Sequence, residues 1–331
     1  MANRHILDSD SLIASVKRRA SIPDAQSMIT DNEILEFANE EMALNLVPLI
    51  YSKHQDYFLV RETVPLVSGQ TRYDIPYRAI GNKLREVAYQ GNGTALQEMF
   101  RMSIDDLTSQ GYTIDNSNNP NRFYIEGEEI VLNTDEDSFT GVGSLVIFYS
   151  LRPNVLVESS NIVTISSIAD NSGTAPNTHL ITFSSTLPST FVDGADIDFI
   201  AKKSPNKIIK FDINIITANN VSNTIVISTD DLPSKLTTDD IAAISGETNL
   251  VNAPSDLHPL LAQMVAARVL ESIGDSQGLG AADKKLKKME KNADLLLANR
   301  VTGSPIKAIN RNGGLRNSLL GRKGRRGYSI D

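Results

Sequence analysis

The apolar residues of this chain change their spacing twice along the sequence. Up to about residue 50 they recur every three or four positions, which is typical of amphipathic helices. From Tyr57 to about residue 249 they form short runs, many alternating with polar residues, which is typical of strands. After Ser255 the helical spacing returns. We therefore expect an α+β fold, with helices from both ends of the chain and strands between them.

The N-terminal helical region predicts two helices. Residues 9–20 form the first, with Asp8 to Asp10 offering an N-cap. Thr30-Asp31-Asn32-Glu33 fits a capping box, in which the Thr and Glu side chains satisfy free backbone N–H groups. The second helix follows this box, and we expect Pro48 to kink or end it.

The C-terminal helical region also predicts two helices. One runs from Leu257 to Ile273 behind Ser255-Asp256, with Gly274 as the residue that ends it. The other covers residues 281–299. Its expected apolar seam steps by four and three, through Ala282, Leu286, Met289, Ala293 and Leu296.

The first half of the middle region predicts a small antiparallel β-sandwich or sheet. We expect strands at 58–64, within 67–76, at 83–89 and at 144–150, and a hairpin at 122–132. A short capped helix is expected at 103–109. These strands and the flanking helices form the expected body, a helical bundle with a sheet over residues 1–158 and 250–310.

Residues 159–249 differ from the body in composition. No Lys or Arg occurs from Pro153 to Ala201, and Ser, Thr and Asn are dense. Short strands are expected at 162–168, 180–184, 196–201, 207–217 and 224–228. Several evenly spaced short strands indicate an all-β, barrel-like or sandwich domain inserted into the body.

Charge divides the chain into an acidic part and a basic part. The formal charge is −8, with 32 Lys and Arg against 40 Asp and Glu in 331 residues. Residues 299–331 hold eight basic residues against Asp331, a charge of +7, so residues 1–298 carry −15. The acidic part argues against a general nucleic-acid coat. The chain has no Cys, which excludes disulfides, zinc–thiolate sites and Cys nucleophiles.

The sequence shows no strong catalytic or metal-binding pattern. None of the four His has a second ligand at metal spacing, and no common nucleotide-binding or hydrolase motif occurs. Residues 115–126 place oxygens as in a calcium loop, but Pro120 stands where that loop needs Gly, which favours a plain turn. We expect no catalytic residue, no metal and no cofactor.

Paired acidic residues suggest structural roles. Asp105 and Asp106 suit a helix start, where negative charge is favourable. Two more adjacent pairs, at 230–231 and 239–240, are poor acid–base dyads, since neighbours on a strand point to opposite faces. Residues 135–137 are expected in a solvated loop. The lysines of 284–291 are expected on a solvated helix face.

The basic segment 311–331 is the strongest candidate for a binding site. It mixes basic residues with apolar ones, which suits a segment that becomes ordered on another protein. A role in phosphate binding stays open, because it needs only charge and flexibility. The candidate docking residues are Arg311, Arg316, Leu319, Leu320, Arg322, Lys323, Arg325, Arg326, Tyr328 and Ile330.

The order of several motifs resembles the head-to-tail adaptor (connector) proteins of tailed bacteriophages. The likeness covers about 1–157 and 250–331. It lies in the acidic start of the second helix (30–39), the G-Q-T-x-Y-x-I-P turn (69–76), the Y-x-x-R-P strand end (149–153) and the S-D-L-H-P-L-L helix start (255–261).

This resemblance implies a structural protein of the virion neck, not an enzyme. Such adaptors form rings, commonly of twelve subunits, whose helices build the wall and whose C-terminal segment reaches onto the portal protein. Downstream tail or nozzle proteins would be further partners, and viral DNA would pass through the lumen without specific binding. The resemblance assigns no role to 159–249.

The N-terminus lacks a signal peptide and no run reaches the roughly 20 apolar residues that span a bilayer, so we expect no membrane association and synthesis in the host cytoplasm. A nucleic-acid-binding protein that uses the basic tail is one alternative function. A glycan- or cation-binding module in 159–249, suggested by Asp196 and Asp198, is another.

Overall fold

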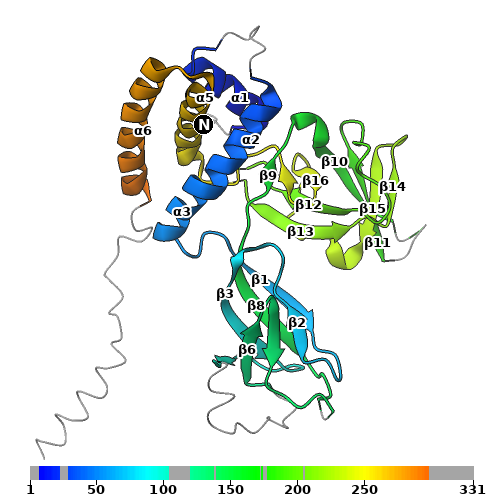
Figure 1. The fold of residues 1–331 in the computed structure, drawn as a ribbon. Coiled ribbons are helices and arrows are strands. Elements are labelled where there is room, and N and C mark those ends of the chain that lie inside the picture. The colour runs from blue at the N-terminus through cyan, green and yellow to red at the C-terminus, as the bar shows by residue number, and fades with distance from the viewer. Residues whose placement is uncertain are drawn as a thin grey trace, which may run out of the picture.

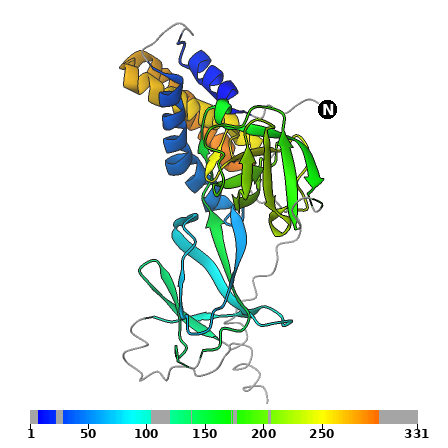
Figure 2. The same ribbon diagram turned by 90° about the vertical axis from the view of Figure 1, so that its right-hand side faces the viewer.

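The chain folds into three lobes, which the two ribbon views place side by side (Figures 1 and 2). The computed structural model describes residues 7–22, 29–103, 120–137, 139–171, 173, 177–203 and 206–297. We call residues 7–53 and 250–297 the helical lobe, residues 59–151 the β-wing, and residues 163–244 the seven-stranded lobe. The α+β class expected from the sequence is confirmed.

The helical lobe joins both ends of the described chain. Helices from the N-terminal and C-terminal regions share one buried apolar cluster, which includes Leu12, Ile34, Leu261 and Val265. Backbone hydrogen bonds also connect the two regions, such as the bond from the Ser9 N–H to the Asn249 carbonyl at 2.8 Å. The helices are α1 (Ser9–Arg19), α2 (Asp31–Glu41), α3 (Val47–Lys53), α5 (His258–Ile273) and α6 (Ser276–Leu296).

Helix boundaries follow the expected capping chemistry. Asp8 accepts the Ser11 N–H at the start of α1. The capping box is present at the start of α2, where Thr30 Oγ1 accepts the Glu33 N–H and Glu33 accepts the Thr30 N–H. Gly274 ends α5 in the left-handed region, with φ of 80°.

Pro48 does not end the second helix. A π-helical turn, Met42–Leu46, follows α2, and α3 continues to Lys53 with Pro48 in its first turn. A proline has no N–H to donate and is best tolerated at the first helical positions. The π turn ends immediately before α3 begins, so Pro48 lies in the first turn of α3. The chain therefore remains helical through Pro48.

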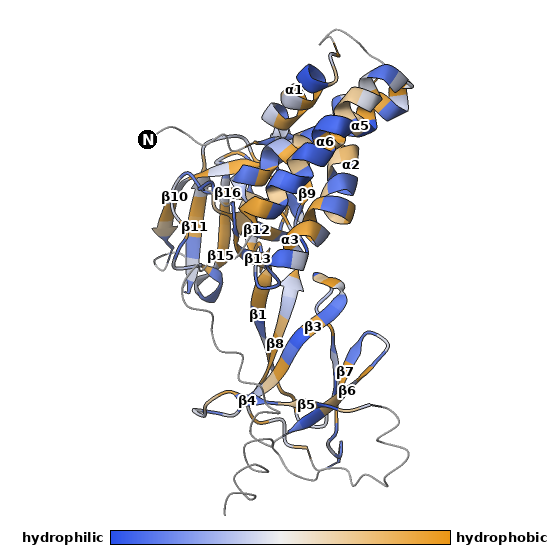
Figure 3. Ribbon diagram, turned by 90° about the vertical axis from the view of Figure 1, so that its left-hand side faces the viewer, coloured by the Kyte–Doolittle hydropathy of each residue, from blue (hydrophilic) through white to orange (hydrophobic). Residues whose placement is uncertain are grey.

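The seam of α6 is confirmed at four of its five positions. Ala282 and Ala293 are buried, and Leu286 and Met289 are half-buried against α5 and its neighbours. Leu296 is 63% exposed, whereas the next residue, Leu297, is buried. The lysines of 284–291 are exposed, as expected, and α6 is largely hydrophilic along its visible face (Figure 3). No helix among the described residues is long and apolar enough to cross a membrane.

The β-wing consists of two four-stranded sheets around one core. The first has the order β1-β8-β3-β4, with β8 antiparallel to both β1 and β3, and the second has the order β2-β7-β6-β5. Tyr149 and Ile147 of β8 are fully buried between them. The strands are β1 (Leu59–Pro65), β2 (Arg72–Asp74), β3 (Ala79–Gln90), β4 (Gln97–Glu98), β5 (Phe100–Arg101), β6 (Arg122–Glu126), β7 (Glu129–Leu132) and β8 (Ser144–Leu151).

The predicted hairpin at 122–132 is present as β6 and β7, and Gly127 takes a positive φ in its turn. Two other expectations cannot be placed in this lobe. Most of the short helix expected at 103–109 lies outside the described residues, and so do residues 115–119 of the calcium-like loop.

The seven-stranded lobe is an open, antiparallel sheet. Its strand order is β13-β12-β16-β10-β11-β15-β14, so β13 and β14 are its edges. No sheet among the described residues closes into a barrel, and the barrel-like form expected here is not confirmed. The strands are β10 (Val163–Asp170), β11 (Thr178–Phe183), β12 (Asp196–Ile200), β13 (Ile208–Asn214), β14 (Thr217–Asn219), β15 (Thr224–Ser228) and β16 (Ile241–Ile244).

Two short strands connect this lobe to the rest of the chain. β9 (Val155–Leu156) leads toward the lobe and β17 (Glu247–Thr248) leads away from it. They pair in parallel, with Val155 opposite Glu247. We call this pair the strap.

Candidate functional site

Side chains of the helical lobe hold the strap through hydrogen bonds to its backbone, of the kind that a neighbouring strand would make. Asn39 of α2 accepts the Leu156 N–H at 2.7 Å through Oδ1 and donates to the Leu156 carbonyl at 3.0 Å through Nδ2. Ser9, at the start of α1, donates its hydroxyl to the Val157 carbonyl at 2.6 Å. Both helices therefore fix the position of the strap.

A buried ion pair joins the β-wing to the seven-stranded lobe beside the strap. Arg78 lies just before β3 and is 5% exposed, and Asp198 of β12 is fully buried. Arg78 Nη1 lies 2.8 Å and 3.0 Å from the two carboxylate oxygens of Asp198. The Arg78 guanidinium also stands 5.3 Å from the ring centre of Phe211, at cation–π distance.

Asn154 links this ion pair to the strap. Its Nδ2 donates to Asp198 at 2.6 Å and to the Glu247 carbonyl at 2.9 Å, and its Oδ1 accepts a bond from Arg78 Nη2. The backbone N–H groups of Asp212 and Gly246 also donate to Asp198, at 3.0 Å and 3.1 Å. Four chain segments thus converge on one carboxylate.

Asp212 forms the outer part of the same network. Its Oδ1 accepts bonds from Tyr77 Oη at 2.7 Å, from Arg78 Nη1 at 3.2 Å and from the Ser245 hydroxyl. Asp212 is partly exposed and Tyr77 is largely exposed, so the network reaches the surface here. We call Tyr77, Arg78, Asn154, Asp198, Asp212 and Ser245 the junction.

The electrostatics of the junction stabilise the charged form of Arg78. Burial alone would lower the pKa of Arg78, but the charge and hydrogen bonds of Asp198, followed by those of Asp212, outweigh it and raise that pKa. Asp198 accepts bonds from Arg78, from Asn154 and from two backbone N–H groups, so both of its oxygens are engaged within the protein. The junction therefore fixes the lobes relative to one another.

Two of the sequence motifs, the turn at 69–76 and the strand end at 149–153, lie directly before junction residues in the chain. In the turn at 69–76, Tyr73 Oη accepts the Val67 N–H at 3.0 Å and donates to the Gln70 carbonyl at 3.1 Å, and Gly69 takes a φ of 74°. This turn and β2 position Arg78, two residues further on. The strand end at 149–153 similarly positions Asn154.

The ten candidate docking residues of 311–331 lie outside the described residues. The described chain ends at Leu297, where α6 approaches α3: Lys53 Nζ lies 3.3 Å from Asp294 Oδ1.

The histidines of the described chain do not gather into a site. His258 is fully buried, where its Nδ1 accepts the Leu7 N–H at 3.2 Å and its Nε2 lies 3.1 Å from the Ala253 carbonyl. Burial lowers the pKa of His258. His54 caps the end of α3 and His179 lies in β11, while His5 is outside the described part. Within that part, no group of three or more possible ligands could hold a metal ion.

The acidic pairs have separate structural partners. Asp231 pairs with Lys210 at 2.9 Å, and Asp240 accepts bonds from the Thr237 N–H and hydroxyl. Residues 135–137 lie in a surface loop, as expected. Asp105 and Asp106 are outside the described residues. Asp196 and Asp198 do not act together, since Asp196 is exposed at the start of β12.

Sequence reasoning did not identify Arg78, Asn154 or Asp212. Asp198 was noted only as part of a possible binding module. One usable signal was present, because Asp198 interrupts the apolar run Ile197–Ile200 in a strand. A carboxylate in such a run requires a buried partner. The identity of that partner, 120 residues away, follows only from the fold.

No family model and no curated protein sequence matches this chain. The order of the sequence motifs and the arrangement of the three lobes are therefore the observations that bear on its function.

Proposed function

We propose that this chain is a structural subunit of a phage neck. It forms a homo-oligomeric head-to-tail adaptor ring, of twelve copies in the family pattern, docks on the portal protein by residues 311–331, and continues the DNA channel toward the tail. It carries no catalytic activity and belongs to the virion.

One observation carries this proposal. The described parts of the two segments that resemble an adaptor, about 1–157 and 250–331, meet in the helical lobe although some 90 residues of inserted chain separate them. Helices α1 and α2 pack directly on α5 in a common apolar cluster. A continuous helical layer of this kind suits the wall of a ring, and we propose that these helices and α6 form the bundle of that wall.

The attachment of the seven-stranded lobe also fits this proposal. Its incoming and outgoing strands form the strap, so the lobe can project from the body without disturbing the helical layer. Residues 159–249, which include this lobe, carry five lysines against ten acidic residues. We propose that the lobe faces outward and contacts neighbouring subunits, tail proteins or the capsid.

The charge distribution also supports the proposal. Residues 1–298 carry a formal charge of −15. An acidic channel wall repels DNA phosphates, so a genome can slide past without sticking. The basic segment beyond it has the opposite charge, as a docking segment for a separate partner should.

The test is assembly with the portal protein encoded by the same genome. Mixing the two proteins should give stacked rings in negative-stain micrographs and one joint peak in size-exclusion chromatography. Deleting residues 311–331 should abolish the joint peak. The adaptor proposal fails if the full chain never joins portal rings, and the docking segment is wrong if the truncated chain joins them normally.

Two matched variants separate the apolar from the basic contribution of the tail. One changes Leu319, Leu320, Tyr328 and Ile330 to Ser and keeps every charge. The other changes Arg316, Arg322, Arg325 and Arg326 to Gln and keeps every apolar side chain. Docking in a protein groove requires that the first variant lose portal binding, since apolar side chains are what a groove-binding segment seats in its groove.

The +7 charge of residues 299–331 favours one second candidate, a nucleic-acid-binding protein. It requires duplex affinity that falls steeply with salt, by about one log unit per phosphate contact for each tenfold rise in salt. A titration that shows no duplex binding at low salt excludes this candidate. The Arg-to-Gln variant would lose such binding while the Ser variant retains it.

A further inference from the structure

The outer face of α6 carries a row of lysines that ends in a leucine. Each member of this row follows a residue of the α6 seam by two positions, and residues two positions apart on a helix point about 200° apart. The row therefore faces away from α5, and its members are exposed, with Leu295 at 72%. Figure 3 shows this hydrophilic side of α6. We call the row the basic stripe: Lys284, Lys288, Lys291 and Leu295.

A row of similar spacing and opposite charge lies on α2 and the π turn that follows it. Its carboxylates stand at positions 33, 36 and 40, and Leu44, which is 72% exposed, ends it. Residues three or four positions apart lie on one face of a helix. α2 contains five acidic residues and no Lys or Arg, so this face carries no positive charge of its own. We call the row the acidic stripe: Glu33, Glu36, Glu40 and Leu44.

The charges of both stripes are largely unused within one copy. No ion pair among the described residues involves a lysine of the basic stripe. In the same part of the chain, Glu36 forms no ion pair. Glu33 binds Thr30 through Oε2, and Glu40 binds Arg268 at 3.0 Å through Oε2, so each keeps its other oxygen free for a new donor.

One copy cannot bring its own two stripes together. Both helices pack on α5, and Figure 1 shows α6 on one side of α5 and α2 on the other. The two helices also run in the same direction, because the end of α3, which continues α2, meets the end of α6 where Lys53 pairs with Asp294. Each stripe is about 16 Å long at about 1.5 Å per residue. The two rows therefore match in length, direction and charge.

We propose that the basic stripe of one copy packs in parallel on the acidic stripe of the next copy of the same chain. The pairs are Lys284 with Glu33, Lys288 with Glu36, Lys291 with Glu40, and Leu295 with Leu44. A contact between two different faces of the same protein repeats by rotation, and it closes into a ring. This inference rests on the proposed function, because it names the contact between neighbours in the adaptor ring.

The parallel alignment has two physical reasons. It places the two exposed leucines against each other, whereas an antiparallel alignment would place Leu295 against the carboxylate of Glu33. A rotation about an axis along the helices also preserves their direction, so helices that are parallel within one copy remain parallel across the contact.

The first test is sedimentation velocity of the full chain. It should form species larger than the monomer, and these should dissociate between about 50 mM and about 500 mM salt, since salt screens exposed charges. One variant carries Lys288→Glu and Lys291→Glu, and the other carries Glu36→Lys and Glu40→Lys. Each variant alone meets like charge with like charge, which should weaken self-association at least about tenfold.

Mixing the two variants should restore association. The reversed α6 of one then meets the reversed α2 of the other, and the two unchanged faces also match, so the copies alternate. Misfolded variants could not be rescued in this way. The proposal is overturned if the full chain remains a monomer at low salt, or if the mixture associates no better than either variant alone.

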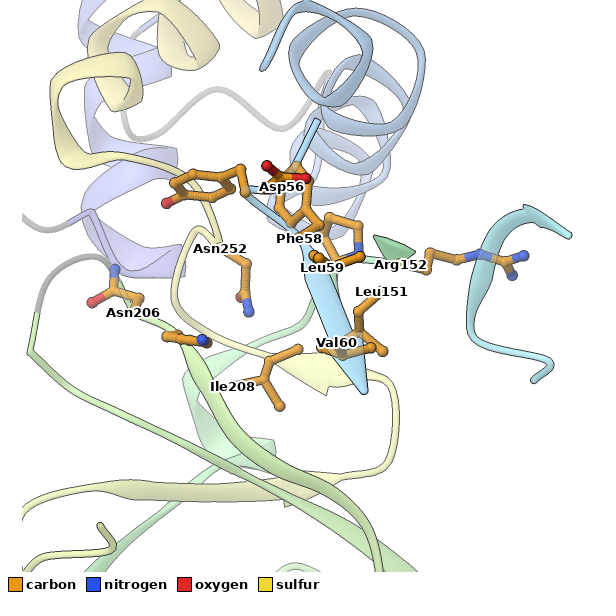
Figure 4. Close-up of a pocket in the computed structure, with 12 residues that line it drawn as sticks. Asp56, Phe58, Leu59, Val60, Leu151, Arg152, Asn206, Ile208 and Asn252 are labelled. Atoms are coloured by element: carbon orange, nitrogen blue, oxygen red, sulfur yellow. The ribbon is translucent and has the colours of Figure 1, made fainter. Parts of the chain in front are cut away.

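A control variant makes the same change in net charge away from both stripes. It carries Lys285→Glu, on the flank of α6, and Lys207→Glu. Lys207 is exposed at the crevice of about 280 Å³ between β1, β8 and β13, which Figure 4 shows and which no stripe residue lines. This control should associate as the unmodified chain does. An equal loss in the control and in the stripe variants would overturn the proposal.

Engineered disulfides test the alignment, because the chain has no Cys of its own. Leu44→Cys and Leu295→Cys, prepared separately and then mixed and oxidised, should give a covalent dimer that contains one of each. Neither should form that product alone, since a disulfide requires Cα atoms within about 7 Å. A dimer of Leu44→Cys with Lys284→Cys, in place of the expected one, would overturn the parallel alignment.

Portal binding, measured in parallel, separates this contact from the adaptor proposal. If the chain joins portal rings and both stripe variants join them equally well, the adaptor proposal stands and the stripe contact is wrong. If the variants and the disulfides behave as expected but the chain never joins portal rings, the stripe contact stands and the adaptor proposal fails.

Discussion

Removing the guanidinium of Arg78 should destabilise the protein strongly. In Arg78→Met the aliphatic volume is largely kept, but the fully buried Asp198 loses its ion-pair partner. Breaking a buried pair in this way costs about 3–5 kcal/mol. Asp198 would keep its bonds from Asn154 and from two backbone N–H groups. We therefore expect the lower end of that range, a loss of about 3 kcal/mol in the free energy of unfolding.

The assay is urea denaturation followed by circular dichroism, with Asp198→Asn and the double variant completing a thermodynamic cycle. Because both single changes break the same interaction, the double variant should lose less than the sum of the two losses. The coupling should be about 1.5–3 kcal/mol, the range for hydrogen bonds to charged groups. Limited proteolysis in the same series should show earlier cleavage near the strap.

Arg72 is the matched control for this experiment. It forms two ion pairs of similar length, 2.8 Å to Glu126 and 2.7 Å to Glu129, but all three side chains are well exposed. Solvent weakens such pairs, so Arg72→Met should change stability far less than Arg78→Met. Equal effects of the two changes, or fully additive losses in the cycle, would refute the view that the buried junction holds the lobes together.

Three other perturbations test separate features. Burial lowers the pKa of His258 below its ordinary 6.5. At a pH between these two pKa values, His258 is protonated in the unfolded chain and neutral in the native chain. Stability should thus fall as the pH drops below 6.5, and His258→Gln should flatten that part of a pH series of urea melts. On α6, Ala293→Asp should cost more than about 2 kcal/mol because it buries a charge, while Leu296→Asp at an exposed position should change stability by less than about 0.5 kcal/mol in the same melts. In the β-wing, a Cβ on Gly141 would lie 2.2 Å from the Val67 carbonyl carbon, so Gly141→Ala should disrupt the wing in thermal melts. Gly81→Ala, which also has a positive φ but open space, should cost only about 1–3 kcal/mol.

Local chemistry explains which parts of the fold could be predicted from the sequence. The capping box at Thr30 and Glu33 and the helix end at Gly274 involve residues only a few positions apart, so sequence is sufficient to find them. Of the two outcomes expected at Pro48, a kink or a helix end, the helix end was wrong because it rested on proline geometry alone. A π turn, which has no clear sequence signature, changed the position of Pro48 within its helix.

Long-range partners explain what could not be predicted. Short strands were expected over 159–249 and are present, yet whether the sheet closes depends on pairing between β13 and β14, and these remain its edges. β16 was missed because Ile241-Ala242-Ala243-Ile244 is short and rich in Ala. The apolar run around Asp198 indicates only that this carboxylate needs a buried partner, and the crossing of distant segments is what makes Arg78 that partner.

The parallel pairing of β9 and β17 constrains how the inserted lobe could have been acquired or could be removed. Parallel neighbours cannot be joined by a tight turn and need a connection of a dozen or more residues. In this chain the whole seven-stranded lobe is that connection. A shortened chain would therefore need a new crossover segment to keep the strap. A replacement module would have to begin where β9 ends and finish where β17 begins. Because the two strands are parallel, these two points lie at opposite ends of the strap and not side by side.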